Sequence, residues 1–356
     1  MKKILIITVL AGLLVFPALS QNPPLDKNWE AVFEDNFNTL NTARWEVKDH
    51  FDDFGGGYPL YLKENTYIVN NERLVFETKK MPTNNPYCCP PQHVDQWGCK
   101  RQWLTGECYQ YTSGCIYSQV PYKYGYFEVY AKLPGGDGYY PTFWMHGSGT
   151  DIANNNCWYN EIDIFEIYPC RQNSIDIAPH WWFSCPNDDE LARYTQAACN
   201  FPYTYHWYGL EWDKDKITWY IDRKSVRQEA NNMEGIGIQN AMYIILSVSL
   251  HSPNDDCPIT NNSIFPNYMY IEQANVWRLR CDNVPVIEIP DFTQYQYGVK
   301  KSISLSGATI IPVDSNISLR ATDYIELKNG FEVPLGAEFY VDINPCDNAA
   351  RVKKQN

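Results

Sequence analysis

Three acidic residues alternate with bulky apolar residues in one short stretch, Asn160-Glu-Ile-Asp-Ile-Phe-Glu-Ile-Tyr168. In a regular strand, side chains alternate between the two faces, so Glu161 and Asp163 share a face while Glu166 points the opposite way. An ionised carboxylate is costly inside an apolar core. One extra residue near Ile164 would return Glu166 to the face of the other two acids, and such bulges are frequent beside active sites. The spacing therefore predicts a β-bulge.

The bulge would also set the distance between the two glutamates. Glu161 and Glu166 would be effectively four strand positions apart, or roughly 13 Å between Cα atoms at about 3.3 Å per residue. If each side chain reaches about 4 Å toward the other, the carboxyls lie on the order of 5 Å apart, the spacing of a retaining glycosidase. Asp163 would lie between them, where like-charge crowding raises at least one pKa. The competing interpretation is a solvated acidic face on an ordinary strand.

The acidic stretch lies within a long region of short alternating segments. From about residue 29 to 281, such segments are separated by turn residues, as in an antiparallel sandwich or barrel. One example is Gly125-Tyr-Phe-Glu-Val-Tyr-Ala-Lys-Leu133, which is followed by a Pro-Gly-Gly turn. We therefore expect an all-β catalytic domain over residues 25–282.

The chain changes character after Cys281. Residues 283–298 contain Pro285 and Pro290 and are predicted to be a linker. Residues 299–346 contain short strand-like pieces separated by glycines, which predicts a small β-rich accessory module. The module shows no catalytic pattern.

The first twenty residues have the form of a signal peptide. Lys2 and Lys3 precede an apolar run that ends near Phe16, and Ala18-Leu-Ser20 offers small residues for cleavage. The apolar run is too short for a membrane span. We expect signal peptide 1–20 to be removed and the protein to be secreted, or located at the cell surface or in the periplasm.

Composition narrows the range of partners. The 356 residues include 29 Lys and Arg against 42 Asp and Glu, a net charge of −13. This charge argues against nucleic acid or an anionic membrane as a partner. Aromatic residues make up 15% of the chain, which suits a protein with aromatic-lined grooves. We expect a monomer that acts on a polysaccharide.

Twelve cysteines in an exported chain predict mostly disulfides, although spacing does not reveal their pairing. A zinc site is the alternative, but the chain has no Cys-x-x-Cys pair. Four of the cysteines lie in residues 81–114, which we interpret as a disulfide-tied insertion. This insertion either shapes a rim of the binding site or covers a sheet edge.

The acidic stretch Glu161-Ile-Asp-Ile-Phe-Glu166 resembles the ExDxxE signature of glycoside hydrolase family 16, in the bulged form of laminarinases, agarases and κ-carrageenases. The resemblance implies a β-jelly roll of two curved antiparallel sheets, with a substrate cleft across the concave face. Further stretches that are similar to the family cover nearly the whole first domain: Phe33–Phe37 with Trp45, Tyr111–Gly114, Tyr124–Gly136, Pro141–Met145, His206–Trp212 and Ile217–Asp222.

The resemblance also implies residue roles. Glu161 would be the nucleophile, Glu166 the general acid and base, and Asp163 their assistant. No cofactor is needed for catalysis. Many family members bind a structural calcium ion, and Glu34 and Glu272 occupy positions where its acidic ligands are expected.

Aromatic residues should supply the platforms on which sugar rings stack. Core packing is the competing role for each of them, and we prefer that role for Trp207, Trp212 and Trp219. A buried hydrogen-bonding role is equally open for the histidine at 206. The candidate substrate contacts are Trp144 and His180, followed by Trp181, Trp182 and His206.

These observations favour an endo-acting retaining β-glycanase that cleaves β-1,3-linked or mixed β-1,3/1,4-glucan. The same chemistry on a marine galactan such as agar, porphyran or carrageenan is the alternative. A lectin that kept the cleft without turnover, or a surface adhesion protein, represents a different class. A lectin would be expected to lose one of the glutamates, whereas this chain keeps both.

Overall fold

The structure is a computed structural model, and two regions of it are built almost entirely of strands. No helix among the described residues is long and apolar enough to cross a membrane. The predicted signal peptide lies outside those residues, as does most of the Cys-rich insertion. The structure describes residues 29–50, 59–84, 109–147, 159–168, 174–182, 201–213, 216–231, 238, 241–251 and 257–279, and most of 281–343.

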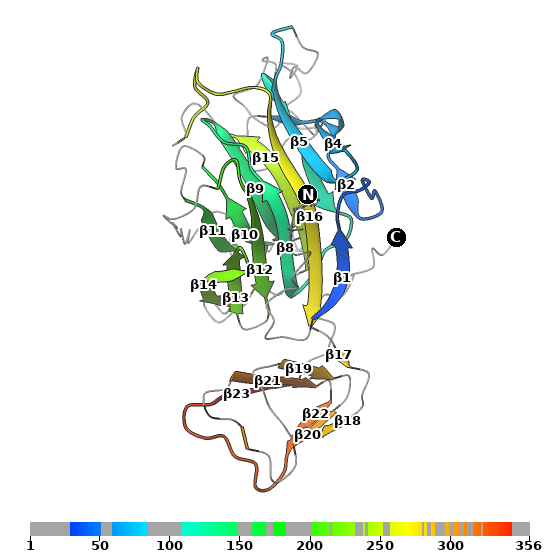
Figure 1. The fold of residues 1–356 in the computed structure, drawn as a ribbon, viewed down its shortest axis with the longest axis vertical. Coiled ribbons are helices and arrows are strands. Elements are labelled where there is room, and N and C mark those ends of the chain that lie inside the picture. The colour runs from blue at the N-terminus through cyan, green and yellow to red at the C-terminus, as the bar shows by residue number, and fades with distance from the viewer. Residues whose placement is uncertain are drawn as a thin grey trace, which may run out of the picture.

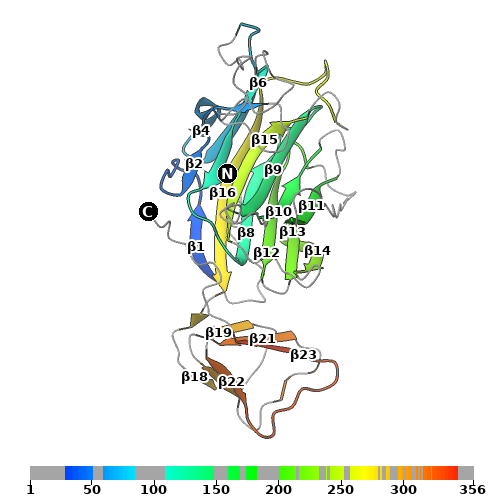
Figure 2. The ribbon, with the colours of Figure 1, turned by 180° about the vertical axis from the view of Figure 1, so that it is seen from behind.

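Two mainly antiparallel sheets pack face to face in the first region (Figures 1 and 2). A short 3-10 helix, Lys63–Asn65, precedes β4. The larger sheet contains, in order, β14 (Lys224–Ala230), β13 (Lys216–Ile221), β12 (Tyr205–Trp212), β8 (Gly125–Lys132), β16 (Asn267–Leu279), β5 (Arg73–Lys80), β6 (Tyr111–Ser113) and β3 (Leu60–Tyr61), with β1 (Trp29–Asp35) paired to β16 and β4 (Thr66–Val69) to β5. The smaller sheet contains, in order, β11 (Asp176–Trp182), β10 (Tyr159–Glu166), β9 (Tyr139–Gly147), β15 (Met242–Leu250), β7 (Cys115–Ser118) and β2 (Trp45–Val47). We call these the ten-stranded and the six-stranded sheet.

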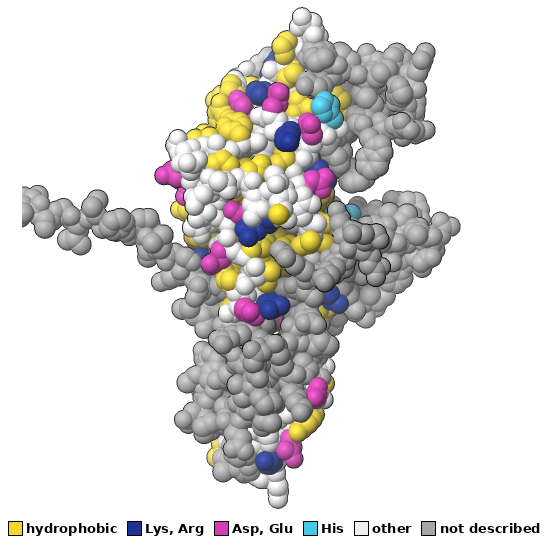
Figure 3. Space-filling view, turned by 90° about the vertical axis from the view of Figure 1, so that its right-hand side faces the viewer, with side chains coloured by type: hydrophobic (Ala, Val, Ile, Leu, Met, Phe, Trp, Pro, Cys, Tyr) yellow, Lys and Arg dark blue, Asp and Glu magenta, His cyan; other side chains and the backbone are white. Residues whose placement is uncertain are grey.

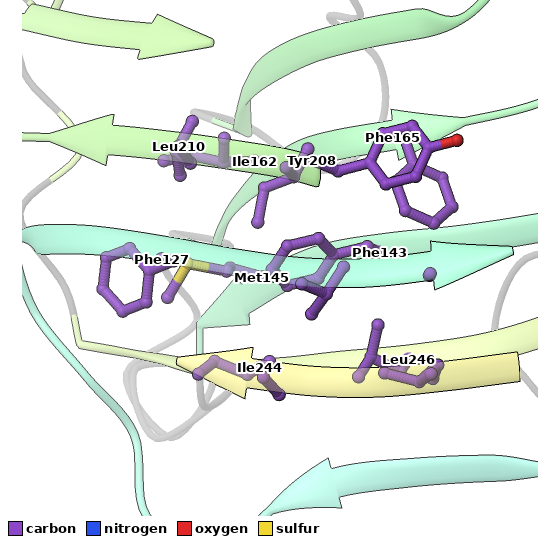
Figure 4. Packing of buried hydrophobic residues seen from close by; sticks show 14 of the residues in the cluster. Phe127, Phe143, Met145, Ile162, Phe165, Tyr208, Leu210, Ile244 and Leu246 are labelled. Atoms are coloured by element: carbon purple, nitrogen blue, oxygen red, sulfur yellow. The ribbon is translucent and has the colours of Figure 1, made fainter. Parts of the chain in front are cut away.

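One hydrophobic core fills the space between the two sheets. Alternate residues of facing strands point into it, such as Tyr208 and Leu210 from β12 and Ile162 from β10 (Figure 4). Trp212 and Trp219 are fully buried in this core, as the sequence predicts. Every strand of the sandwich therefore has one face toward the core and one outer face.

Gly114 marks the point where the chain passes from one sheet to the other. It connects β6 of the ten-stranded sheet to β7 of the six-stranded sheet. A Cβ atom at this position would lie 2.6 Å from Phe76 and 2.8 Å from the Asn65 carbonyl oxygen. Only glycine fits this close approach.

The C-terminal region is a stack of parallel strands in two small sheets. Because the chain alternates between these sheets, the region resembles a short solenoid around its own apolar core. One sheet contains β17 (Cys281–Asp282), β19 (Gln296–Val299), β21 (Asn316–Ala321) and β23 (Glu338–Ile343), and the other contains β18 (Val286–Glu288), β20 (Ser302–Leu305) and β22 (Tyr324–Leu327).

The module begins earlier than its predicted boundary at residue 299. Two strands of the predicted linker, β18 and β19, pair with β20 and β21 of the module. These strands are only three and four residues long, and residues between them include Pro290, so the sequence pattern alone resembled a linker. The first coil of the stack therefore includes part of residues 283–298.

Cysteines are only partly described. Cys257 is in a disulfide, whereas Cys115 is a buried thiol. Basic and acidic side chains are intermixed over the described part of the face in Figure 3.

Candidate active site

The acidic strand β10 contains the predicted bulge. Between Asp163 and Phe165, β10 advances two residues while the paired strand β9 advances one. Against β11, β10 advances three residues from Asp163 to Glu166 while β11 advances two. The extra residue lets the consecutive side chains of Ile164 and Phe165 both enter the core. Glu166 is thereby returned to the face of Glu161.

Residues that pair directly across neighbouring strands point to the same face of a sheet. The three acids therefore define three parallel rows on the outer face of the six-stranded sheet, which we call the Glu161, Asp163 and Glu166 rows. Across β15, β9, β10 and β11 the rows are Tyr243, His146, Glu161 and His180; Ile245, Trp144, Asp163 and Ala178; and Ser247, Thr142, Glu166 and Asp176.

The rows fix the separation of the two glutamates. Glu161 pairs with His146 and Glu166 with Thr142, four residues apart on β9. That spacing corresponds to roughly 13 Å between Cα atoms. Both side chains are half-buried, and if the two converge across this gap their carboxyls would lie on the order of 5 Å apart. A single sugar linkage fits between a nucleophile and an acid at this distance.

Asp163 lies between the glutamates and is 1% exposed. Its Oδ2 lies 2.7 Å from His180 Nε2. Its main-chain carbonyl accepts a hydrogen bond of 2.8 Å from the indole N–H of Trp219, which reaches across the core from β13. Because a bulge interrupts the regular ladder, this indole satisfies a carbonyl at the irregular position. The opposite sheet thus helps to hold the bulge in place.

Burial and mutual repulsion raise the pKa values of two acids on this strand, Glu161 and Asp163. Burial raises the pKa of the Glu161 carboxyl well above its usual range, and the charge of Asp163 adds to the rise while His180 opposes it. Burial likewise raises the pKa of Asp163 well above its usual range, with a further contribution from Glu166. A cluster of this kind retains a proton near neutral pH and so contains both an acid and a base.

A tyrosine that the sequence analysis did not single out contacts the third acid. The Tyr140 hydroxyl donates a hydrogen bond to Glu166 Oε1. The Tyr140 ring packs against Tyr168 and His251, with centroid distances of 5.1 and 4.6 Å. Alternation along β9 could have placed Tyr140 on the same face as Trp144, but the contact itself joins residues 26 positions apart.

Trp144 and His180 lie beside the acids, as predicted. Trp144 is half-buried in the Asp163 row and packs against a small cluster that includes Tyr61 and Ile245. Contact of Trp144 and His180 with sugar stays a prediction. Trp181 and Trp182 pair in the ladder with Asn160 and Tyr159, and their side chains lie outside the described part of the structure.

His206 lies elsewhere, on β12 of the ten-stranded sheet. Its Nε2 is 2.8 Å from Thr204 Oγ1, and its Nδ1 is 2.9 Å from Asp222 Oδ2. The ring also contacts Phe201 and Tyr208, which are fully buried. Both ring nitrogens are therefore engaged in hydrogen bonds within the protein, and contact of His206 with substrate stays a prediction.

The two residues predicted for calcium, Glu34 and Glu272, lie on the neighbouring strands β1 and β16. Glu34 on β1 is exposed and pairs with Asn275. Glu272 lies three residues before Asn275 on β16, and its carboxylate is 3.7 Å from Arg73 Nη1. The calcium site stays a prediction.

Glu161, Asp163 and His180 offer potential metal-ligand atoms within 4.8 Å of one another. His180 Nε2 already contacts Asp163 Oδ2. We therefore describe the three side chains as a hydrogen-bonded cluster and assign no metal ion to them.

Similarity to known proteins agrees with this geometry. A family model described as "Glycosyl hydrolases family 16" matches residues 60–256, more than half of the chain. The kappa-carrageenase of Pseudoalteromonas carrageenovora is 26% identical over 297 residues, which cover 74% of this chain and 69% of that protein. Glucan endo-1,3-beta-glucosidase A1 of Niallia circulans is 25% identical over 269 residues, which cover 69% of this chain and only 37% of that protein.

Solved structures show the same fold. The laminarinase catalytic domain from Thermotoga maritima MSB8 matches with a TM-score of 0.56 at 22% identity, covering 70% of this chain and 98% of that one. The endo-beta-1,3-glucanase from Pyrococcus furiosus matches with a TM-score of 0.56 at 24% identity, covering 70% of this chain and 95% of that one. These likenesses confirm the expected jelly-roll fold.

Proposed function

The chain belongs to glycosyl hydrolases family 16, and from this premise we propose that it is an endo-acting retaining β-glycanase. The observation that carries the proposal is the one-residue bulge in β10. It puts Glu161, Asp163 and Glu166 on one face, with the two glutamates four ladder positions apart. An inverting enzyme would need a wider gap, about 6.5–9.5 Å, to admit a water molecule.

The reaction proceeds in two displacements. Glu161 attacks the anomeric carbon while Glu166 donates its proton to the departing glycosidic oxygen, which leaves a glycosyl ester on Glu161. Glu166, now ionised, removes a proton from a water molecule that attacks the same carbon. The ester bond breaks, the sugar leaves with its β configuration, and both glutamates return to their starting state.

Asp163 serves the nucleophile in this scheme. Burial raises the pKa of Asp163 and so favours the protonated form of the central carboxyl, and in that form the carboxyl can donate a hydrogen bond to Glu161. His180, held 2.7 Å from the other carboxyl oxygen, fixes the side chain of Asp163. This arrangement reduces repulsion when Glu161 is ionised and ready to attack.

The substrate we propose first is a β-1,3-linked or mixed β-1,3/1,4-glucan. Tyr117 on β7 pairs with Ile245 and so extends the Asp163 row by one strand. A cation lies beside it, because Lys48 Nζ is 4.1 Å from the centroid of the Tyr117 ring. That cation is already ion-paired with Glu46 at 3.0 Å, so it supports a neutral polymer better than a sulfated one. The kappa-carrageenase relative keeps a galactan as the second candidate.

A panel of polysaccharides tests the proposal. Release of reducing ends from laminarin or mixed-linkage glucan, and none from the Glu161→Gln variant, is the expected result. Release only from agar, porphyran or carrageenan would transfer the proposal to the galactans. Tight binding to one polymer without release by the native protein would indicate a lectin and refute the enzymatic role.

We also propose that the protein acts outside the cytoplasm as a disulfide-containing monomer. The signal-peptide pattern of residues 1–20 and the disulfide at Cys257 support this location. An N-terminus beginning near residue 21 in protein recovered from the culture medium or periplasm is the expected result.

A further inference from the structure

We propose that Tyr140 is a positioning residue that fixes the orientation of the Glu166 carboxyl and favours its ionised form. This inference rests on the proposed role of Glu166 as general acid and base. Three observations carry it: a direct hydrogen bond, an aromatic cluster that fixes the tyrosine, and the crowding of acids around Glu166.

The position of Tyr140 follows from strand register. Thr142 on β9 pairs directly with Glu166, and Tyr140 lies two residues away on the same face of β9. The backbone N–H of Ile167 donates to the carbonyl of Pro141 at 3.3 Å, which holds the two strands together at this level. The Tyr140 hydroxyl can therefore reach diagonally to Glu166 Oε1, to which it donates its proton.

The ring of Tyr140 is held from two sides. Tyr168, two residues beyond Glu166, lies 5.1 Å from it between ring centroids, and His251, just after β15, lies 4.6 Å from it. Tyr168 and His251 stack on each other at 4.7 Å. The backbone N–H of His251 donates to the carbonyl of Gly138 at 2.8 Å. A tyrosine packed in this way contributes a fixed donor.

Titratable groups face Glu166 from each neighbouring element. Glu161 and Asp163 lie on its own strand, and Asp176 pairs with it from β11. Tyr140 faces it from β9, and His251 adjoins Tyr140 at the end of β15. Three carboxyls thus favour the protonated form of Glu166, whereas the Tyr140 hydroxyl favours the ionised form because it donates a hydrogen bond to the carboxylate.

The Tyr140 hydroxyl keeps its proton, and so remains a hydrogen-bond donor, over the pH range in which such an enzyme works. Burial raises the pKa of Tyr140 well above its usual range, and the charge of Glu166 adds to the rise. Tyr140 therefore does not itself supply or remove the proton of the reaction. Its effect is to keep Glu166 able to lose a proton to the leaving group and to act as a base in the second step.

The test is Tyr140→Phe in the full-length protein, with pH profiles of kcat and kcat/KM on whichever polysaccharide the native enzyme cleaves. Loss of the donor should move the alkaline limb of kcat/KM upward by about one pH unit. We also expect kcat near neutral pH to fall by about tenfold, because the second step needs ionised Glu166. A profile that superimposes on that of the native enzyme would overturn the proposal.

Tyr220→Phe is the matched control. Tyr220 donates a hydrogen bond of 2.9 Å to Glu211 Oε2 in the ten-stranded sheet, away from the three acids. The Tyr220→Phe variant also removes a hydrogen bond from a tyrosine hydroxyl to a glutamate. Any change due only to weaker packing or lower stability should therefore appear in both variants. The pH profile of Tyr220→Phe should match that of the native enzyme.

A substrate-free measurement separates this proposal from the proposed function. The side-chain carboxyl carbon of Glu166 can be titrated by NMR in the native protein and in Tyr140→Phe, with thermal unfolding as a check on folding. A higher midpoint in the variant supports the proposal even if no polysaccharide is cleaved. Unchanged midpoints would refute it even in an active glycanase.

Discussion

Glu128 and Asp163 are both 1% exposed, and each lies on the outer face of its own sheet, yet their surroundings differ. Glu128 accepts hydrogen bonds from Arg223 at 2.9 and 3.3 Å and from Asn275 at 3.3 Å. Asp163 instead lies between two glutamates with a histidine beside it. A buried carboxylate paired with arginine is a structural element, whereas crowded carboxyls are costly and indicate a site kept for chemistry.

The aromatic residues of the two faces differ in the same way. On the ten-stranded sheet, Trp207 stacks on Tyr130 at 4.8 Å and lies 4.0 Å from the guanidinium carbon of Arg223. Its ring faces are therefore occupied by protein. Trp207 lies on the outer face rather than in the core that the sequence predicted for it. Trp144 on the six-stranded sheet is half-buried beside the acids, and it is the residue that we propose as a sugar platform.

The largest expected effect is that of Glu161→Gln. Loss of the nucleophile should reduce kcat by at least about 10⁴-fold. Because burial raises the pKa of Glu161, its contribution to stability is fully present below the unfolded-state pKa, near 4.3, and is lost as pH rises through the folded-state value. The variant should therefore be more stable than the native protein at pH 7 and similar to it at pH 4.

Activity assays and denaturant unfolding at both pH values check this prediction. A Glu161→Gln protein that is less stable at pH 7 would show that Glu161 is a structural residue, and the contrast with Glu128 would fail.

Glu128→Gln should show the opposite pattern. Removing this charge leaves Arg223 without its carboxylate and should lower the free energy of unfolding by about 3 kcal/mol. The kcat of the folded fraction should remain within about twofold of the native value, because Glu128 lies on the other sheet from the acids. Chemical denaturation and turnover measured well below the melting temperature test both parts. A large fall in kcat without loss of stability would contradict the comparison.

Trp219→Phe tests how the opposite sheet supports the bulge. The variant keeps an aromatic ring but removes the N–H that binds the Asp163 carbonyl. We expect a loss of about 1–3 kcal/mol of stability and, because the acids shift, a fall in kcat of about tenfold. Trp212→Phe is the control, since the Trp212 indole nitrogen has no hydrogen-bond partner among the described residues. Equal losses of kcat in the two variants would remove the special role of Trp219.

The smallest effects concern the aromatic faces. Trp144→Ala should raise KM for the polymer by about tenfold, because it removes a stacking platform beside the acids. Trp207→Ala should leave KM within about twofold of the native value. Steady-state kinetics on the same polymer measure both. A larger effect at Trp207 would place substrate on the ten-stranded sheet.

Local pattern predicted the sandwich and the bulge well. The alternation of β10 would bury Glu166 unless one residue is inserted, and that conflict is visible within nine residues. The same alternation does not reveal Tyr140 on Glu166 or Trp219 on Asp163, because these contacts join residues 26 and 56 positions apart. Trp207 was misplaced because an apolar residue type does not indicate which face of its strand is covered.

The module boundary was misjudged for a related reason. β18 and β19 are too short to show alternation, and their strand character comes from parallel pairing with β20 and β21. Parallel partners lie about a coil away in the chain, so a local window cannot detect them.

The configuration of the first sugar released tests the central claim most directly. Proton NMR spectra recorded within the first minutes of hydrolysis should show the β anomer at the new reducing end, with the α anomer appearing later by mutarotation. An α anomer released first would mean that water attacks the substrate directly. That result would contradict a bulged strand whose two glutamates lie close enough for a covalent intermediate.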